Sequence, residues 1–231
     1  MSPPHDAPRP SHDTVRPSQG TVHLHDTVRR SYDAVAEEYA EHLDDELEYK
    51  PFDRGLLAAL IEQARAGAPI ADVGCGPGHV AAWMTAHGAT TVGFDLSPAM
   101  VAVAGRLHPE VTVLEGDFLS LPAGDGEFGA VVAFYSIIHL LPEERPAAFA
   151  EIRRVLRSRG LLLVSFHVGT EVRHRDEWWG HEVDVDFRFL EPLVILEELE
   201  AAGFVLELAA ERVAYPDEGP TRRAYLMARR S

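Results

Sequence analysis

The hydrophobic pattern of the chain begins with helical spacing. Apolar side chains recur at steps of three and four from about residue 28, which places them on one face of a helix. These positions are Val28, Tyr32, Val35, Tyr39 and Leu43. Asp26 is a good N-cap for this helix, and a second amphipathic helix is predicted from about Asp53.

From residue 69 the pattern changes to short, continuous apolar runs that alternate with amphipathic stretches. The runs predicted as strands cover residues 69–73, 91–95, 111–114, 130–135 and 161–166. Strands that are apolar throughout and separated by helices indicate a parallel sheet covered by helices on both faces. The sequence therefore predicts an α/β fold of the Rossmann-like kind.

The C-terminal part departs from this alternation. A helix near 192–202 leads into predicted strands at 204–213 and 222–228. The connection between these strands is too short for a crossover helix, so they should form an antiparallel hairpin. We therefore expect a parallel sheet that ends in an antiparallel pair.

Composition and charge narrow the class of protein. The 231 residues suffice for one α/β domain, and 21 basic against 37 acidic side chains give a formal net charge of −16. This charge opposes binding to nucleic acid or to an anionic membrane. Cys75 is the single cysteine, which excludes an intrachain disulfide and is compatible with the cytoplasm. We expect a cytoplasmic monomer or homodimer.

The first 25 residues have a different composition from the rest. They are rich in Pro, His, Ser and Asp and offer little apolar surface for burial. Residues 1–25 are therefore predicted to be a mobile N-terminal arm, followed by one domain over residues 26–231.

The first predicted strand runs into a glycine-rich segment, Asp72-Val73-Gly74-Cys75-Gly76-Pro77-Gly78-His79. Glycines allow a tight turn and a close approach of the backbone to a ligand. The spacing is G-x-G-x-G, whereas a dinucleotide site favours G-x-G-x-x-G and would need glycine in place of His79. A tight turn without a ligand is the alternative interpretation.

Two further strands end in carboxylates. The second ends in Asp95-Leu96-Ser97, where a carboxylate can accept hydrogen bonds from ribose hydroxyls. Asp95 could instead cap the next helix, but Ser97 is better placed for that role. The third ends in Gly116-Asp117-Phe118, where the acid can accept from an exocyclic amine and the ring can cover a purine.

With these motifs in place, the chain resembles the class I methyltransferases that bind S-adenosylmethionine. The resemblance implies a seven-stranded sheet in the order 3-2-1-4-5-7-6, with strand 7 antiparallel. It places the methionine moiety at Asp72 to Gly78, the ribose at Asp95 and the adenine at Asp117-Phe118. The segment Tyr32-Asp33-x-x-Ala36-x-x-x-Tyr39 resembles the N-terminal region, here 26–67, that closes over the cofactor in many small-molecule members. The cofactor-binding residues implied are Tyr32, Tyr39, Asp72, Gly74, Cys75, Gly76, Gly78, Asp95, Leu96, Ser97, Gly116, Asp117, Phe118 and Phe134.

The family places the acceptor at the end of the fourth strand, which here reads Phe134-Tyr135-Ser136-Ile137-Ile138-His139. This segment does not resemble the Asn/Asp-Pro-Pro-Tyr/Phe motif of nucleic-acid amino-methylating members. It also lacks the metal-binding acids of catechol-type members, so we expect a metal-independent enzyme and a small-molecule acceptor. The insertion 168–189 is predicted to cover the substrate, although its tryptophans could serve only to attach it to the core. The predicted substrate residues are Tyr135, Trp178, Trp179 and His181.

In-line methyl transfer requires alignment of three atoms and exclusion of water. If the acceptor is a hydroxyl, a base is useful, and His139 and His167 at strand ends are the candidates. Packing or helix capping is the alternative role for each histidine. Oxygen is the favoured acceptor atom, with nitrogen, sulfur and carbon left open. The competing functions are an NAD(P)-dependent oxidoreductase and a non-catalytic cofactor-binding module.

Overall fold

The computed structural model describes residues 21–64, 68–216 and 218–231, with side chains from His25 onward. The predicted arm lies largely outside these residues. Its last five residues, however, belong to helix α1 (Thr21–Leu43), which begins five residues before the predicted start at Asp26. Asp26 is inside the helix and does not cap it.

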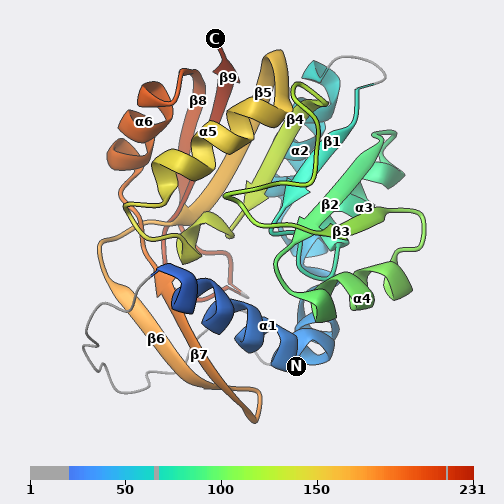
Figure 1. The fold of residues 1–231 in the computed structure, drawn as a ribbon, viewed down its shortest axis with the longest axis vertical. Coiled ribbons are helices and arrows are strands. Elements are labelled where there is room, and N and C mark those ends of the chain that lie inside the picture. Colours follow the sequence, from blue (N-terminus) through green and yellow to red (C-terminus); the bar gives the residue numbers. More distant parts are fainter. Residues whose placement is uncertain (1–20, 65–67, 217) are drawn as a thin grey trace.

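A seven-stranded sheet forms the centre of the molecule (Figure 1). Its order is β3-β2-β1-β4-β5-β9-β8, and β9 runs antiparallel to both of its neighbours. The predicted order 3-2-1-4-5-7-6 and the C-terminal hairpin are thereby confirmed. The strands are β1 (Ile70–Val73), β2 (Thr91–Asp95), β3 (Thr112–Glu115), β4 (Phe128–Phe134), β5 (Leu156–His167), β8 (Phe204–Arg212) and β9 (Arg223–Arg230).

Helices cover both faces of this sheet, as predicted (Figure 1). The α-helices after α1 are α2 (Pro51–Gln63), α3 (His79–Ala86), α4 (Pro98–Leu107), α5 (Arg145–Val155) and α6 (Pro192–Ala201). Two 3₁₀ turns, η1 (Glu46–Tyr49) and η2 (Ile137–His139), complete the helical elements of the described residues. Helix α2 begins at Pro51, two residues before the expected start, because proline suits the first helical turn. The Ser97 side chain accepts from Met100 N and caps α4 as predicted.

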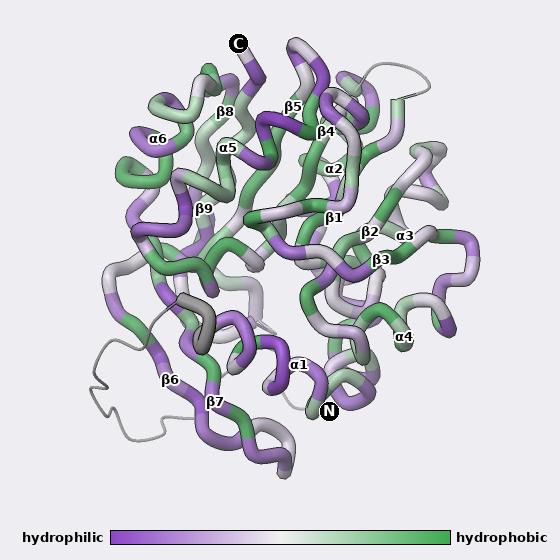
Figure 2. The backbone as a smooth tube through the Cα atoms, viewed as in Figure 1, coloured by the Kyte–Doolittle hydropathy of each residue, from purple (hydrophilic) through white to green (hydrophobic). Residues whose placement is uncertain are grey.

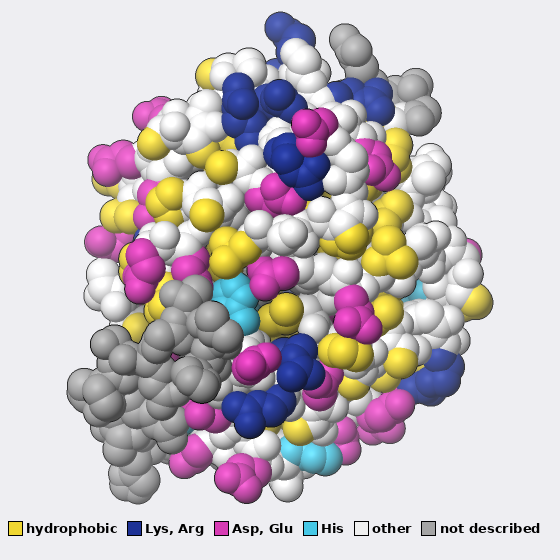
Figure 3. Space-filling model, viewed as in Figure 1, with side chains coloured by type: hydrophobic (Ala, Val, Ile, Leu, Met, Phe, Trp, Pro, Cys, Tyr) yellow, Lys and Arg dark blue, Asp and Glu magenta, His cyan; other side chains and the backbone are white. Residues whose placement is uncertain are grey.

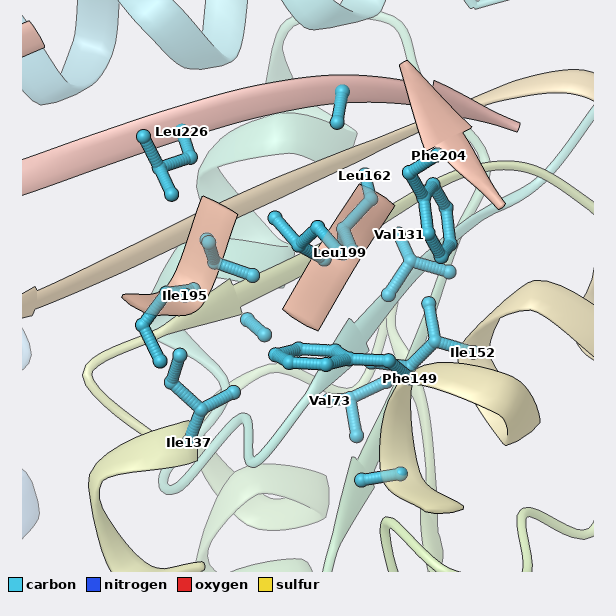
Figure 4. Packing of buried hydrophobic residues seen from close by; sticks show 14 of the residues in the cluster. Val73, Val131, Ile137, Phe149, Ile152, Leu162, Ile195, Leu199, Phe204 and Leu226 are labelled. Carbon is cyan, nitrogen blue, oxygen red and sulfur yellow. The ribbon is translucent and has the colours of Figure 1, made fainter. Parts of the chain in front are cut away.

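Each face of the sheet has its own apolar core. On one face, α5 and α6 pack on the central strands through side chains such as Phe149, Ile195 and Leu199 (Figure 4). On the other face, Leu57 and Met84 contribute to a core built with α2 and α3. Figure 2 shows β4 and β5 as mainly hydrophobic, which is the pattern of strands covered on both sides.

The insertion between β5 and α6 is a separate two-stranded ribbon, β6 (Val172–Trp178) and β7 (His181–Arg188), paired antiparallel. The turn between the strands consists of Trp179 and Gly180, both with positive φ. Helix α1 packs on this ribbon through one apolar cluster and on α4 through another. The ribbon thus supports α1 from the side opposite to α4 (Figure 1).

Phe149 offers a test of the larger core. Its side chain is fully buried between α5 and the sheet, so Phe149→Ala should lower the free energy of unfolding by about 3–5 kcal/mol. Urea denaturation followed by circular dichroism measures this change. Leu193→Ala on α6 is the control: Leu193 is 73% exposed, and its loss should change stability by less than about 0.5 kcal/mol.

Candidate functional site

Helix α1 crosses the carboxyl edge of the parallel strands (Figure 1). A cavity lies between α1 and the loops at these strand ends. The cavity encloses about 790 Å³ of free space, its open mouth included. It is lined by residues from α1 and from the loops after β1, β2, β3 and β4. These are His25, Val28, Arg29, Tyr32, Tyr39, Gly74, Gly76, Asp95, Leu96, Ser97, Gly116, Asp117, Phe118, Phe134, Tyr135, Ser136, His139 and Leu140.

The glycine loop after β1 forms the floor of the cavity. Gly74 has φ +73°, and a Cβ there would lie 2.3 Å from the Cβ of Ser136. Only glycine can therefore bring the loop this close to the end of β4. The hydroxyl of Ser136 donates to the carbonyl of Val73 at 2.8 Å, which fixes the two loops together.

Asp95, at the end of β2, is held in place by backbone amides. Its Oδ2 accepts from Gly76 N at 2.7 Å and its Oδ1 from Ser97 N at 2.9 Å. Burial raises the pKa of this carboxyl to about 6, although these hydrogen bonds oppose the rise. Each carboxylate oxygen has a second lone pair, so Asp95 can still accept from hydroxyl groups in the cavity.

Asp72 lies behind the glycine loop and does not line the cavity. It is 1% exposed, and its Oδ2 has no hydrogen-bond partner among the described residues. Burial raises the pKa of its carboxyl to about 7, while His79 nearby acts to lower it. A buried carboxylate oxygen without a partner is costly, and a ligand ammonium would satisfy it.

Asp117 and Phe118 follow β3 at the far end of the cavity. Asp117 Oδ1 accepts from Leu119 N at 2.8 Å, and its Oδ2 lies 2.8 Å from Nδ1 of His25. The aromatic ring of Phe118 lines the cavity beside this carboxylate. An acid and an aromatic ring in this arrangement suit the amine and the face of a purine.

His139 on η2 and Tyr32 on α1 form a hydrogen-bonded pair at the opposite end. Nδ1 of His139 lies 3.1 Å from the carbonyl oxygen of Asp186, which can only accept, so Nδ1 carries the proton. Nε2 therefore accepts from the hydroxyl of Tyr32 at 2.8 Å. Burial lowers the pKa of His139 to about 4, so the imidazole is neutral at physiological pH.

Several residues predicted for the site lie elsewhere. Cys75 is buried against Gly93, with Sγ 2.8 Å from the position a Cβ would take there, and Gly78 begins α3. His167 is hydrogen-bonded to Thr221 at 2.9 Å and does not line the cavity. These positions place Cys75, Gly78 and His167 outside the cavity wall.

The predicted substrate residues of the ribbon also lie outside the cavity wall. Trp178 packs edge-on against Tyr32 and Tyr39. The ring of Trp179 stacks on that of Trp178, with 5.0 Å between the ring centroids. Nε2 of His181 lies 2.9 Å from Oε1 of Glu38 on α1. The tryptophans thus join the ribbon to α1.

Sequence reasoning missed His25, Val28, Arg29, Ser136 and Leu140 as cavity residues. The first three could have been found, because they precede Tyr32 by seven, four and three positions and so share its helical face. Ser136 and Leu140 flank the irregular turn η2, where no periodic pattern indicates which side chain faces a cavity.

Within the described ranges, no three His, Cys, Asp or Glu side chains come together as a metal site. No described helix has the length and apolar character needed to cross a bilayer.

Comparisons with known proteins agree with this geometry. Residues 70–160 match the model of a methyltransferase domain. An uncharacterised methyltransferase of Oceanobacillus iheyensis is 26% identical over 61% of this chain and 60% of its own length. A demethylmenaquinone methyltransferase of Beutenbergia cavernae is 31% identical over 62% of this chain and 55% of its own length. The chain thus spans about half to three fifths of the curated relatives it first matches.

Among solved structures, the fold is similar to that of a Burkholderia thailandensis 1,6-didemethyltoxoflavin-N1-methyltransferase with bound S-adenosylhomocysteine. The TM-score is 0.73 at 19% identity, over 94% of this chain and 93% of that one. The matched residues thus form a methyltransferase domain, and the fold of the chain is that of the solved S-adenosylmethionine-dependent methyltransferases to which it is similar. S-Adenosylmethionine is the cofactor of this family.

Asp95 provides the sharpest test of the cofactor site. Asp95→Ala should weaken binding of S-adenosylhomocysteine by about 10- to 100-fold, because hydrogen bonds to a charged acceptor are lost. Isothermal calorimetry measures the affinity. Glu115→Ala is the matched control, because Glu115 is the exposed register partner of Asp95 on β3 and lies outside the cavity. Equal affinities for both variants would contradict the assignment.

Proposed function

We propose that this protein transfers a methyl group from S-adenosylmethionine to a small-molecule acceptor, with oxygen as the favoured acceptor atom. The observation that carries the proposal is the single cavity that contains Gly74, Asp95, Asp117 and His139, contributed by four strand ends. The names of the matched relatives support a small-molecule acceptor, since they specify demethylmenaquinone and 1,6-didemethyltoxoflavin. The net charge of −16 supports it as well. On the face in Figure 3, basic side chains are interspersed with acidic ones.

The cofactor would be held along the strand ends. Asp72 and the glycine loop would hold its methionine moiety, Asp95 its ribose, and Asp117 with Phe118 its adenine. When bound, S-adenosylmethionine supplies a methyl group that is already activated by a positively charged sulfur. The protein must then align the acceptor and exclude water. Helix α1 performs the second task by covering the cavity.

We assign proton acceptance to Nε2 of His139. The proton on Nδ1 is fixed by the Asp186 carbonyl, so Nε2 presents its lone pair to the cavity side, where Tyr32 now donates to it. An acceptor hydroxyl can take the place of Tyr32 or donate to the Tyr32 oxygen. In the second arrangement, the Tyr32 hydroxyl passes its proton to Nε2 of His139 and takes the proton of the acceptor hydroxyl.

His167 takes a supporting role in this proposal. The centroid of its ring lies 5.1 Å from that of Tyr135 and 5.3 Å from that of Phe189. The hydroxyl of Thr221 is hydrogen-bonded to its Nδ1. The histidine thereby fixes the orientation of Tyr135, which lines the cavity. We therefore assign positioning of the substrate to His167 and a larger role in the reaction to His139.

The cavity wall indicates the character of the acceptor. Beyond the carboxylates, its wall includes Val28, Phe134, Tyr135 and Leu140, which are apolar or aromatic. Such a wall suits an apolar or aromatic acceptor with few polar groups. Trp178, Trp179 and His181 would then influence substrate binding through α1, on which the ribbon packs.

Methyl transfer is tested with labelled S-adenosylmethionine and a panel of phenols, carboxylic acids, amines and thiols. With a methylated acceptor in hand, His139→Ala should lower kcat about 100-fold, because proton acceptance is lost. His167→Ala should mainly raise KM. Because the pKa of His139 is lowered to about 4, its lone pair stays available as pH rises, and kcat should fall only below about pH 5. Unchanged rates in both variants would remove the histidines from the mechanism.

We also propose that the reaction needs no metal ion. Treatment with EDTA followed by gel filtration should leave the methylation rate unchanged. A loss of activity that magnesium or manganese restores would contradict this.

The same protein can be tested for the competing functions. Calorimetry with NAD and with S-adenosylhomocysteine distinguishes an oxidoreductase from a methyltransferase. Tight NAD binding without S-adenosylhomocysteine binding would overturn the proposal. Tight S-adenosylhomocysteine binding without turnover of any acceptor would favour a cofactor-binding module.

A further inference from the structure

The first described side chain of α1 reaches into the adenine end of the cavity. His25 lies on the turn of α1 that precedes Val28 and Arg29, and it lines the cavity with them. Its Nδ1 is 2.8 Å from Oδ2 of Asp117, and its Nε2 is 3.1 Å from Oε1 of Glu144. Both ring nitrogens therefore face carboxylates that belong to different loops of the sheet domain.

Glu144 makes this arrangement unusual. It is 4% exposed, and its Oε2 accepts from Leu141 N at 2.8 Å. Its Oε1 is buried and has no hydrogen-bond partner within the described ranges, although His25 lies at ion-pair distance. A buried carboxylate oxygen in this position is stabilised by a cation nearby. His25 can supply that cation only when both of its nitrogens carry protons.

We propose that the His25 imidazolium is a positioning residue of the cofactor site, which orients Asp117 and, by bridging Asp117 and Glu144, holds α1 closed over a bound cofactor. The inference rests on the proposed function, because it takes the cavity to be the S-adenosylmethionine site. Asp117 can serve His25 and an adenine amine together, because its carboxylate offers more lone pairs than Leu119 N and His25 occupy. The bridge and the cofactor are therefore compatible, and closure by His25 slows release.

The charges around His25 determine how closure depends on pH. The hydrogen bond to Asp117 raises the pKa of His25 above its usual 6.5; burial opposes this, and the charges of Asp117 and Glu144 add to it. Burial tends to raise the pKa of Asp117, but the His25 hydrogen bond leaves it below its ordinary value. Arg29, one turn along α1, faces the same cavity and pairs with Asp33 and Asp26 of its own helix. The bridge is complete below pH 6.5 and is lost as pH rises through the raised pKa of His25.

The test measures the rate at which labelled S-adenosylhomocysteine leaves the whole protein in an excess of unlabelled compound. At pH 6, His25→Ala should release the label about tenfold faster than wild type, because a charge-assisted bridge is absent. This ratio should fall toward one at pH 9, where wild type has itself lost the bridge. Asp72 and Asp95 also titrate, but they are present in both proteins, so their effects cancel in the ratio.

Two further variants separate closure from a general structural effect. His25→Arg keeps a cation at every pH tested and should keep release slow at pH 9, where wild type is fast. His42→Ala removes a histidine from the last turn of the same helix, outside the cavity, and should show the wild-type pH profile.

The outcomes distinguish failure of the His25 role from failure of the proposed function. A ratio that does not change with pH, or slower release from His25→Ala, would overturn the role of His25 while leaving the proposed function standing. Slower release would mean that His25 competes with the cofactor for Asp117. Failure of the wild-type protein to bind S-adenosylhomocysteine at all would overturn the proposed function and this inference with it.

Discussion

The structure depends on the polar contacts that hold α1 across the carboxyl edge of the sheet. The strand-end loops that line the cavity present glycine backbone and the carboxylates of Asp95 and Asp117 there. Helix α1 meets these loops in turn: His25 lies against Asp117 after β3, Asp33 accepts from Ser97 after β2, and Tyr32 donates to His139 after β4. Without these contacts the strand ends would form an open groove, and water would reach the reacting atoms. A closed cavity therefore requires a helix from outside the alternating β–α pattern.

Two buried acids lie at this cavity: Asp95 lines it, and Asp72 lies behind the glycine loop that forms its floor. Asp72 and Asp95 have raised pKa values because burial disfavours their charge. Such groups reduce the stability of the empty protein at neutral pH, since the folded state holds protons that the unfolded state has already lost. A ligand with an ammonium group and hydroxyls removes much of this cost. The same residues thus favour the cofactor and make the empty fold less stable than an apolar floor would.

The sheet and the strand-end residues that line the cavity could be predicted from the sequence because both follow local rules. Continuous apolar runs specify buried parallel strands, and the residue after such a run lies at the carboxyl edge whatever the rest of the fold does. The start of α1 was not predicted, because the composition of residues 21–25 resembles that of the preceding segment. Strand β6 was not predicted because its mostly charged sequence shows no alternation of apolar and polar residues. Its end packs in the apolar cluster that β7 and α1 complete, and that contact is not local in sequence. The contact of His25 with Asp117 spans 92 positions, which no local pattern reports.

The β6–β7 ribbon has its own small cluster of apolar side chains and pairs with no strand of the main sheet. It enters the domain at one point of the chain, between β5 and α6. Changes in its length or sequence would therefore alter the support of α1 without disturbing the loops that surround the glycine turn. In evolutionary terms, the ribbon that supports α1 is free to diverge while the strand-end loops of the cavity stay constant.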